Sequence, residues 1–244
     1  MIVCEVGLNH LGNEEYSTMY VEKLSKSKCD AISYQIREPK FYEKDKYKDY
    51  ELSFEHYQGL IKSTDKKFGI ALADDGYLEM SEDLNPDFYK VLSWDLTNYK
   101  YIDRLLNETE KPIYVSTGTS SLDDLDNFFN RYGSNERISF IHTQLTKSPE
   151  DTNLKAIPFL QNRYPYGVGF GNHSENLNVI LGSIVFEPQD IWFYVKDADF
   201  GWRYHPDEFW SVLVSDVDLM IENIKVIKSS LGDGLKTSIN TKGY

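Results

Sequence analysis

The sequence of 244 residues has few cysteines, few cationic residues and no long hydrophobic run. Its two cysteines, Cys4 and Cys29, fall in segments that we predict to be buried, which argues against a disulfide framework and favours a reducing compartment such as the cytoplasm. The 26 Lys and Arg residues are outnumbered by 39 Asp and Glu residues, so the net charge of -13 disfavours nucleic acid and anionic membranes as partners. No window approaches the roughly 18 apolar residues that a membrane-spanning helix needs.

What the sequence does contain is a regular alternation of short apolar runs and longer amphipathic segments, which is typical of parallel βα units. The predicted strands are Ile2–Gly7, Ala31–Gln35, Phe68–Leu72, Phe88–Val91, Pro112–Ser116, Ile138–His142, Gly167–Phe170 and Ile191–Lys196. The predicted helices are Tyr16–Ser27, Phe54–Thr64, Tyr99–Asn107, Leu122–Tyr132, Thr152–Asn162, Leu177–Val185 and Pro206–Ser230. Eight units without a break predict one closed (β/α)8 TIM barrel, a single domain over residues 1–244.

Polar side chains are concentrated where the predicted strands end. In a TIM barrel, catalytic groups lie at the carboxyl ends of the strands and in the loops that follow them. We therefore expect the active site among these residues. They include Glu5, Asn9, His10, Gln35, Arg37, Asp74, Asp75, Ser93, Asp95, Ser116, His142, Asn172, His173, Lys196 and Asp197.

Glu5 is unusual because it lies in the middle of an apolar strand, within the run Ile-Val-Cys-Glu-Val-Gly. Burying a charge costs several kcal/mol or more unless the group is paired, hydrogen-bonded or protonated. Two explanations are open. Glu5 either acts in catalysis or forms a structural bridge to Lys90 or Lys196.

Residues 5–12 read Glu-Val-Gly-Leu-Asn-His-Leu-Gly, which is similar to the pattern EIGxNHxG. With the segments below, this opening resembles the family of sialic acid synthases, which make N-acetylneuraminate and related nine-carbon sugars from phosphoenolpyruvate. Residues 30–35 resemble its DAVKFQ motif, 89–95 its YKIGSGE motif, 115–119 its LSTGM motif, 148–157 its PPEDVNLRAI motif and 169–174 its GYSDHT motif. The matches run in family order from Glu5 to about Glu208, and they imply a TIM barrel.

The resemblance implies the condensation of phosphoenolpyruvate with the open-chain aldehyde of N-acetylmannosamine or a related sugar, assisted by manganese or magnesium. It implies that Glu5 handles protons or water at the reacting centre. It also implies a metal ligand at His173, and Asp197 stands where the family has a second histidine ligand. The candidate substrate-binding residues are Asn9, His10, Gln35, Arg37, Lys90, Ser93, Asp95, Ser116 and Lys196; Asn9 and His10 either contact substrate or fix the first loop.

The sequence departs from the family pattern at three expected anion contacts, which are Ser33, Leu145 and Gly171. Arg37, two positions after Gln35, is a candidate replacement for the lysine that Ser33 displaces. We further expect the C-terminal antifreeze-like domain of the family to be absent. A homodimer of barrels is also expected.

Three interpretations of function stay open. The first is a phosphoenolpyruvate-dependent sugar-acid synthase with altered substrate choice. The second is a metal-dependent aldolase or lyase that acts on a less anionic substrate, which would account for the lost lysine and serine. The third is a non-catalytic relative that binds a sugar or a partner, because a shared fold does not by itself carry a reaction. The sequence names neither the sugar nor the metal.

Overall fold

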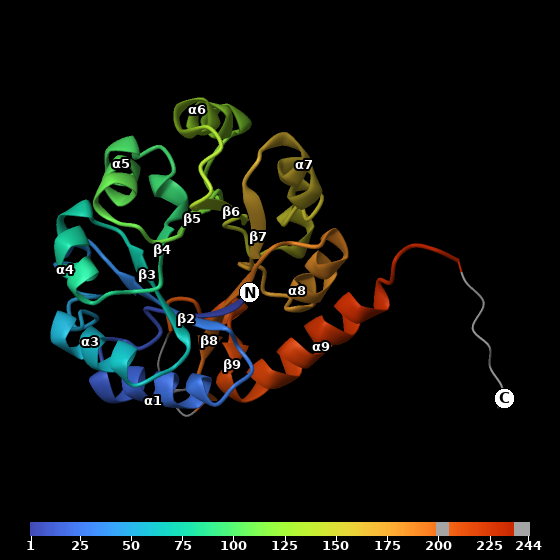
Figure 1. Cartoon of the computed structure of the whole chain (residues 1–244). Coiled ribbons are helices and arrows are strands. Elements are labelled where there is room, and N and C mark those ends of the chain that lie inside the picture. Colours follow the sequence, from blue (N-terminus) through green and yellow to red (C-terminus); the bar gives the residue numbers. More distant parts are fainter. Residues whose placement is uncertain (199–204, 237–244) are drawn as a thin grey trace.

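A computed structural model of the chain describes residues 1–198 and 205–236, and its centre is a closed barrel of parallel strands (Figure 1). Each strand pairs with the next along the chain, and β1 also pairs with β8, which closes the ring. The strands are β1 Ile2–Gly7, β2 Ala31–Ile36, β3 Lys67–Leu72, β4 Phe88–Val91, β5 Ile113–Ser116, β6 Ile138–His142, β7 Gly167–Gly171 and β8 Ile191–Lys196. The predicted (β/α)8 TIM barrel is confirmed.

Helices surround the barrel on its outer side (Figure 1). They are α1 Glu14–Ser25, α2 Pro39–Tyr42, α3 Phe54–Lys62, α4 Leu78–Asp83, α5 Tyr99–Glu108, α6 Leu122–Tyr132, α7 Ala156–Arg163, α8 Asn178–Ser183 and α9 Val217–Ser230. The short helices α2 and α4 were not expected from the sequence. Helix α6 begins with a capping box, in which the Ser121 and Asp124 side chains each accept a hydrogen bond from the other residue's backbone N–H.

The segment after β8 differs from the single helix predicted over Pro206–Ser230. A 3₁₀ turn, η6 (Glu208–Trp210), is followed by the short strand β9 (Val212–Leu213) and by a second 3₁₀ turn, η7 (Val214–Asp216), before α9 begins. Strand β9 runs parallel to β8, with Val212 opposite Val195. The chain just before β9 therefore lies at the carboxyl end of β8, where it can contribute to the mouth of the barrel.

Alternate residues of a strand point to the same side, so each strand directs one set of side chains into the barrel and the other set toward the helices. Inside the barrel, Val3, Ala31, Phe88, Ile141 and Trp192 pack in a buried hydrophobic cluster that we call the lower layer. The intervening residues, such as Cys4 and Phe193, belong to the larger core between strands and helices. Polar side chains replace the apolar ones two positions further along several of the same strands.

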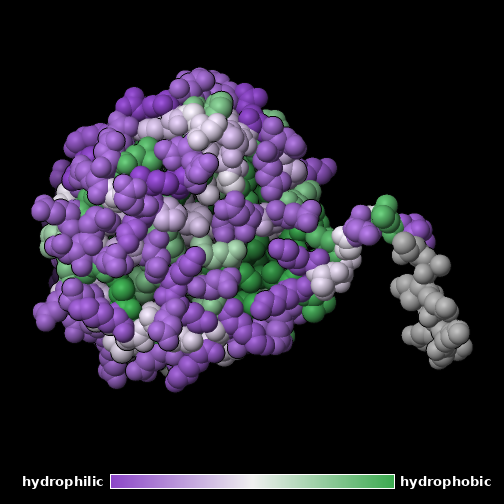
Figure 2. All heavy atoms as spheres, in the orientation of Figure 1, coloured by the Kyte–Doolittle hydropathy of each residue, from purple (hydrophilic) through white to green (hydrophobic). Residues whose placement is uncertain are grey.

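Hydrophilic residues cover most of the face shown in Figure 2, and the hydrophobic ones are concentrated beside α9. Cys4 and Cys29 are buried and free, as their predicted positions in the fold require. Within residues 1–198 and 205–236, no helix is both long enough and apolar enough to cross a membrane.

Candidate active site

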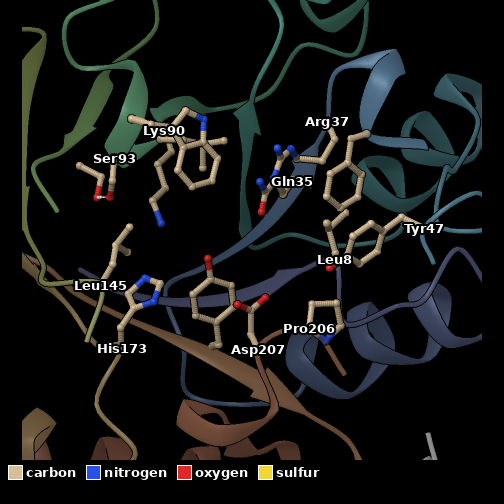
Figure 3. Close-up of a pocket in the computed structure, with 15 residues that line it drawn as sticks. Leu8, Gln35, Arg37, Tyr47, Lys90, Ser93, Leu145, His173, Pro206 and Asp207 are labelled. Carbon is tan, nitrogen blue, oxygen red and sulfur yellow. Dashed lines mark hydrogen bonds between the residues drawn. The ribbon is translucent and has the colours of Figure 1, made fainter. Parts of the chain in front are cut away.

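A cavity of about 190 Å³ opens at the carboxyl ends of the strands (Figure 3). Six of the sequence-predicted site residues line it, which are Gln35, Arg37, Lys90, Ser93, Ser116 and His173. The remaining lining residues are Leu8, Phe41, Tyr47, Leu92, Trp94, Leu145, Tyr194, Pro206 and Asp207. The structure thus brings together residues that are far apart in the sequence and come from at least five strands or the loops that follow them.

Lys90 connects this cavity to Glu5. Its ammonium group forms a buried ion pair with the Glu5 carboxylate, and both side chains are only 6% exposed. The ammonium also lies 5.4 Å from the centre of the Trp192 ring, at the upper surface of the lower layer. The bridge to Lys90 that the sequence left open is therefore formed. Glu5 does not itself line the cavity, but it lies directly behind a residue that does.

Three departures from the family pattern affect the interior of the barrel and its cavity. Ser33 on β2 is the register partner of Glu5 on β1 and is buried. With serine rather than lysine at position 33, the charge of Glu5 is met by Lys90. Leu145 lines the cavity and contributes an apolar wall where a polar contact was expected, and Gly171 contributes no side chain at all.

A pair of hydroxyl groups lies beside Lys90. The Oγ atoms of Ser93 and Ser116 are 2.8 Å apart and buried. The loop after Ser116 packs against them, since a Cβ atom at Gly118 would lie 2.7 Å from the Ser93 Oγ. Glycine at this position is required by that close approach. Thr119 fixes the same loop by donating a hydrogen bond from its hydroxyl to the Ser93 carbonyl at 2.6 Å.

Arg37 forms the opposite wall. Its guanidinium donates two hydrogen bonds to Glu38, at 2.9 and 3.0 Å, and lies 4.2 Å from the centre of the Phe41 ring and 5.1 Å from that of Trp94. Stacking and a bidentate carboxylate restrict the side chain to one geometry. Arg37 is therefore a pre-oriented cation at the cavity, although its charge is partly met by Glu38.

His173 faces the cavity beside the rings of Tyr194 and Trp210, at 5.5 and 5.4 Å between ring centres. Burial, and then the nearby charge of Lys90, lower the pKa of the imidazole to about 3. The ring is consequently neutral at physiological pH, which is the form that ligates metals.

Asp197, the second predicted metal ligand, does not lie with His173. Trp192 and Tyr194 point into the barrel, so the alternation of β8 directs Phe193, Val195 and the following Asp197 to the outside. There the Asp197 carboxylate pairs with Lys23 of α1 at 2.6 Å. Among the described residues, no three His, Cys, Asp or Glu side chains are grouped as a metal site. The predicted His173 and Asp197 pair therefore does not fit a divalent cation in this structure.

Four other predicted substrate contacts lie outside the cavity. His10 is buried against Tyr34, with ring centres 5.8 Å apart, and burial lowers its pKa to about 3. Asp95 lies in the 3₁₀ turn η2 (Ser93–Asp95), and burial raises its pKa to about 6. Lys196 donates to the Glu208 carbonyl at 2.9 Å. Asn9 donates to the Val195 carbonyl at 2.8 Å, so of the two roles left open for it, the structure supports fixing a loop.

Asp207 is a carboxyl group at the cavity that was not among the predicted site residues. Its carboxylate points toward the centre of the cavity (Figure 3). Burial, and then the charge of Glu5, raise its pKa to about 7, while Lys90 acts in the opposite direction. The helix predicted over Pro206–Ser230 includes residue 207, so no sequence pattern singled it out. The signal that was available is its position in the segment after the eighth predicted strand, because polar residues that follow barrel strands lie at the active-site end.

Gly7 shapes the same side of the cavity. It has a positive φ of +56°, at an irregularity in the pairing of β1 with β2. A Cβ atom there would lie 2.8 Å from the Tyr194 ring and 3.5 Å from an Asp207 carboxylate oxygen. Both the backbone conformation and the close packing require glycine.

Comparison with known proteins bears on the identity of this site. The NeuB family model matches residues 16–236. An uncharacterized protein of Methanocaldococcus jannaschii is 28% identical over 257 residues, covering 96% of this chain and 73% of that protein. The N,N'-diacetyllegionaminic acid synthase of Campylobacter jejuni is 23% identical over 271 residues, covering 97% and 78%.

Solved structures agree on the fold. The N-acetylneuraminic acid (sialic acid) synthetase of Leptospira borgpetersenii superposes with a TM-score of 0.85 at 20% identity, covering 98% of this chain and 87% of that chain. Identity at this level supports the shared barrel rather than a shared substrate. The resemblance to sialic acid synthases is confirmed by the family match, which spans most of the sequence: this chain belongs to the NeuB family.

Proposed function

We propose that the chain is a phosphoenolpyruvate-dependent synthase that joins three carbons to a sugar aldehyde and yields a sialic-acid-like sugar acid. The observation that carries this proposal is the convergence of Lys90, Ser93 and Ser116 on one cavity with Arg37 and Gln35. These groups are hydrogen-bond donors, and two of them are cations. The similar proteins include an N,N'-diacetyllegionaminic acid synthase and an N-acetylneuraminic acid synthetase, which supports the same reaction class.

Phosphoenolpyruvate carries a phosphate and a carboxylate, so its site needs several charge-assisted donors. Lys90 and the two serine hydroxyls form one group of donors, and Arg37 forms a second group across the cavity. Lys90 and Arg37 already contact Glu5 and Glu38, which lowers their net attraction for an anion. The substrate would therefore be held by two cations that already have carboxylate partners.

Glu5 is proposed as the base of this reaction. When carbon 3 of phosphoenolpyruvate bonds to the aldehyde carbon, carbon 2 becomes electron-poor and is attacked by water. A carboxylate beside the cavity can accept the proton that this water loses. Glu5 has the required acceptor oxygens, and its contact with Lys90 places it next to the proposed anion-binding group.

Metal dependence is general among NeuB family synthases, and a divalent cation would supply polarisation of the aldehyde oxygen. Of the two predicted ligands, His173 faces the cavity and Asp197 is paired with Lys23 outside the barrel. Because the donor set does not fit, no step of the proposed reaction is assigned to a metal.

The test is an assay of the purified chain with phosphoenolpyruvate and a panel of amino-sugar aldehydes, with N-acetylmannosamine included. We expect inorganic phosphate and, by mass spectrometry, a product equal to the sugar plus the three-carbon acid. Glu208→Gln is a matched control, because Glu208 offers its backbone carbonyl rather than its carboxylate to Lys196. Phosphate release that needs no sugar, or no release with any sugar, would contradict the proposal.

A second candidate is an aldolase or lyase that acts on a less anionic substrate. The apolar Leu145 in the cavity wall, and the carboxylate partners of both cations, favour it. Such an enzyme would release pyruvate from a sugar acid without any need for phosphate. The same panel, extended to sugar acids and read by pyruvate formation, distinguishes the two reactions, and no turnover in either direction would favour a non-catalytic sugar-binding relative.

A further inference from the structure

Asp207 places a second carboxyl group at the site, and the reaction step proposed for Glu5 does not use it. It projects from the segment between β8 and β9, and it shares the cavity with Tyr194 and Pro206 (Figure 3). The other charged and titratable groups around the cavity are Glu5 on β1, Arg37 and Tyr47 after β2, Lys90 on β4, His173 after β7 and Tyr194 on β8. The charge of Glu5 is among the causes that raise the pKa of Asp207.

The backbone around Asp207 is held by a polar side chain from the opposite end of the sequence. The Asn9 side-chain oxygen accepts a hydrogen bond from the Asp207 N–H at 3.2 Å. The Asn9 amide group donates to the Val195 carbonyl at 2.8 Å and to the Ser211 hydroxyl at 3.3 Å. Asn9 is fully buried, so these bonds are made away from water.

Two further bonds complete this support. The Ser211 hydroxyl donates to the Asp207 carbonyl at 2.6 Å, and the Lys196 ammonium donates to the Glu208 carbonyl at 2.9 Å. Asp207 is therefore fixed on both sides of its peptide unit, relative to β1 and to β8. A site residue placed by such a network keeps its geometry without contacting the supporting groups through its own carboxylate.

We propose that Asp207 is a second acid–base residue of this site, which protonates the aldehyde oxygen of the sugar during carbon–carbon bond formation, and that Asn9 is its positioning residue. This inference rests on the proposed function. Asp207 would supply an acid for the aldehyde oxygen, a task that was expected of a metal held by His173 and Asp197.

The proton balance closes over one turnover. The electron pair of the carbon–carbon double bond of phosphoenolpyruvate forms the new bond to the aldehyde carbon. The carbonyl π pair moves to the aldehyde oxygen, which takes the proton of the Asp207 carboxyl group and becomes a hydroxyl. Water then adds to carbon 2 and gives a proton to Glu5. Loss of phosphate leaves the ketone and takes up the remaining hydroxyl proton, and transfer from Glu5 to Asp207 restores both groups.

A carboxyl group suited to this role has a pKa close to the working pH, because it must both hold and release a proton. Burial and the charge of Glu5 raise the pKa of Asp207 to about 7. In other enzymes a carboxyl group whose pKa is raised by its environment serves as the general acid. The value supports an assignment that already stands on the placement of the side chain.

The experiment compares wild type with Asp207→Asn, Asn9→Ala and, as the neighbouring control, Glu208→Gln. We expect Asp207→Asn to lower kcat by on the order of 100-fold or more, with the KM for phosphoenolpyruvate changed less than about threefold. Asn9→Ala should lower kcat less and should move the upper limb of the pH profile of kcat, because Asp207 would lose its fixed environment. A merely structural Asn9 would reduce the yield of folded enzyme and leave that limb unchanged.

The outcomes separate the two proposals. If wild type turns over and the activity of Asp207→Asn is within about threefold of wild type, the role of Asp207 is overturned and the proposed function stands. Wild-type enzyme that releases no phosphate with any sugar would overturn both. As a second readout, a carbon-13 titration of labelled aspartate carboxyls should show one midpoint near pH 7 that is absent in Asp207→Asn, and absence of this signal in wild type would also overturn the assignment.

Discussion

The lower layer of the barrel and the cavity above it use the same strands for different purposes. Val3, Phe88 and Trp192 fill the lower layer, and Glu5, Lys90 and Tyr194 follow two positions later on the same three strands. The lower layer is buried and apolar, whereas the next layer contains a buried ion pair and faces a cavity. Packing thus fixes the strands, and the fixed strands hold charged groups that would not pack well by themselves.

The largest effect should come from a substitution in the polar layer that contains Glu5 and Lys90. Glu5→Gln keeps the side-chain shape but removes the proposed base, so we expect kcat to fall about 100- to 10,000-fold. Phosphate release under saturating substrate measures it. The fold should persist, which a melting curve checks. Activity within a few fold of wild type would assign Glu5 to structure alone.

On the apolar side, Phe88→Ala should lower the free energy of unfolding by about 3–5 kcal/mol, because it opens a space between Trp192 and Tyr114. Chemical denaturation measures the change. The protein that remains folded should still bind phosphoenolpyruvate, since Phe88 lies below the cavity rather than in its wall. Loss of binding in demonstrably folded protein would show that the two layers are not separable.

Asp207→Asn should alter how stability depends on pH. Because burial raises the pKa of Asp207 from its ordinary value near 3.8 to about 7, the folded state binds more protons than the unfolded state in this range. The stabilising contribution is complete below about pH 3.8 and is lost as the pH rises through about 7. Relative to wild type, the variant should gain stability with rising pH by at most about 1.4 kcal/mol per unit, less any reduction from partial exposure. Parallel stability curves would contradict the shift.

The smallest effect concerns the metal. Millimolar manganese or magnesium should leave the melting temperature of wild type unchanged to within about 1 °C, because Asp197 is paired with Lys23 and does not join His173. His173→Ala should respond in the same way. A larger upward shift in wild type that disappears in His173→Ala would restore the predicted metal site.

The barrel could be predicted because its strands are short apolar runs bounded by polar residues. The bounds of Ile2–Gly7, Phe88–Val91, Ile138–His142 and Ile191–Lys196 were all obtained from sequence. The conformation of the segment before α9 could not be predicted, because it depends on a hydrogen bond between Asn9 and Asp207, which are 198 residues apart along the chain. Local sequence carries no information on such a bond.

Two differences between the predicted and the observed site have different physical origins. Asp197 was assigned from its place in a family motif, and the run Ile-Trp-Phe-Tyr-Val before it is apolar throughout, so the sequence alone did not show that Trp192 and Tyr194 face the interior and residue 197 faces outward. Asp207 was missed because aspartate within a predicted helix gives no distinctive signal. The homodimer, the compartment and the absence of a further domain stay predictions.

Calorimetric titration of phosphoenolpyruvate tests the central claim most directly, namely that the polar layer is an anion site centred on Lys90. Wild type should bind, and folded Lys90→Met should bind at least about 30-fold more weakly, as loss of a charge worth about 2 kcal/mol or more requires. Phe88→Leu, two positions earlier on the same strand, should bind within about threefold of wild type. Equal affinity in wild type and Lys90→Met, or no binding in wild type, would contradict the account.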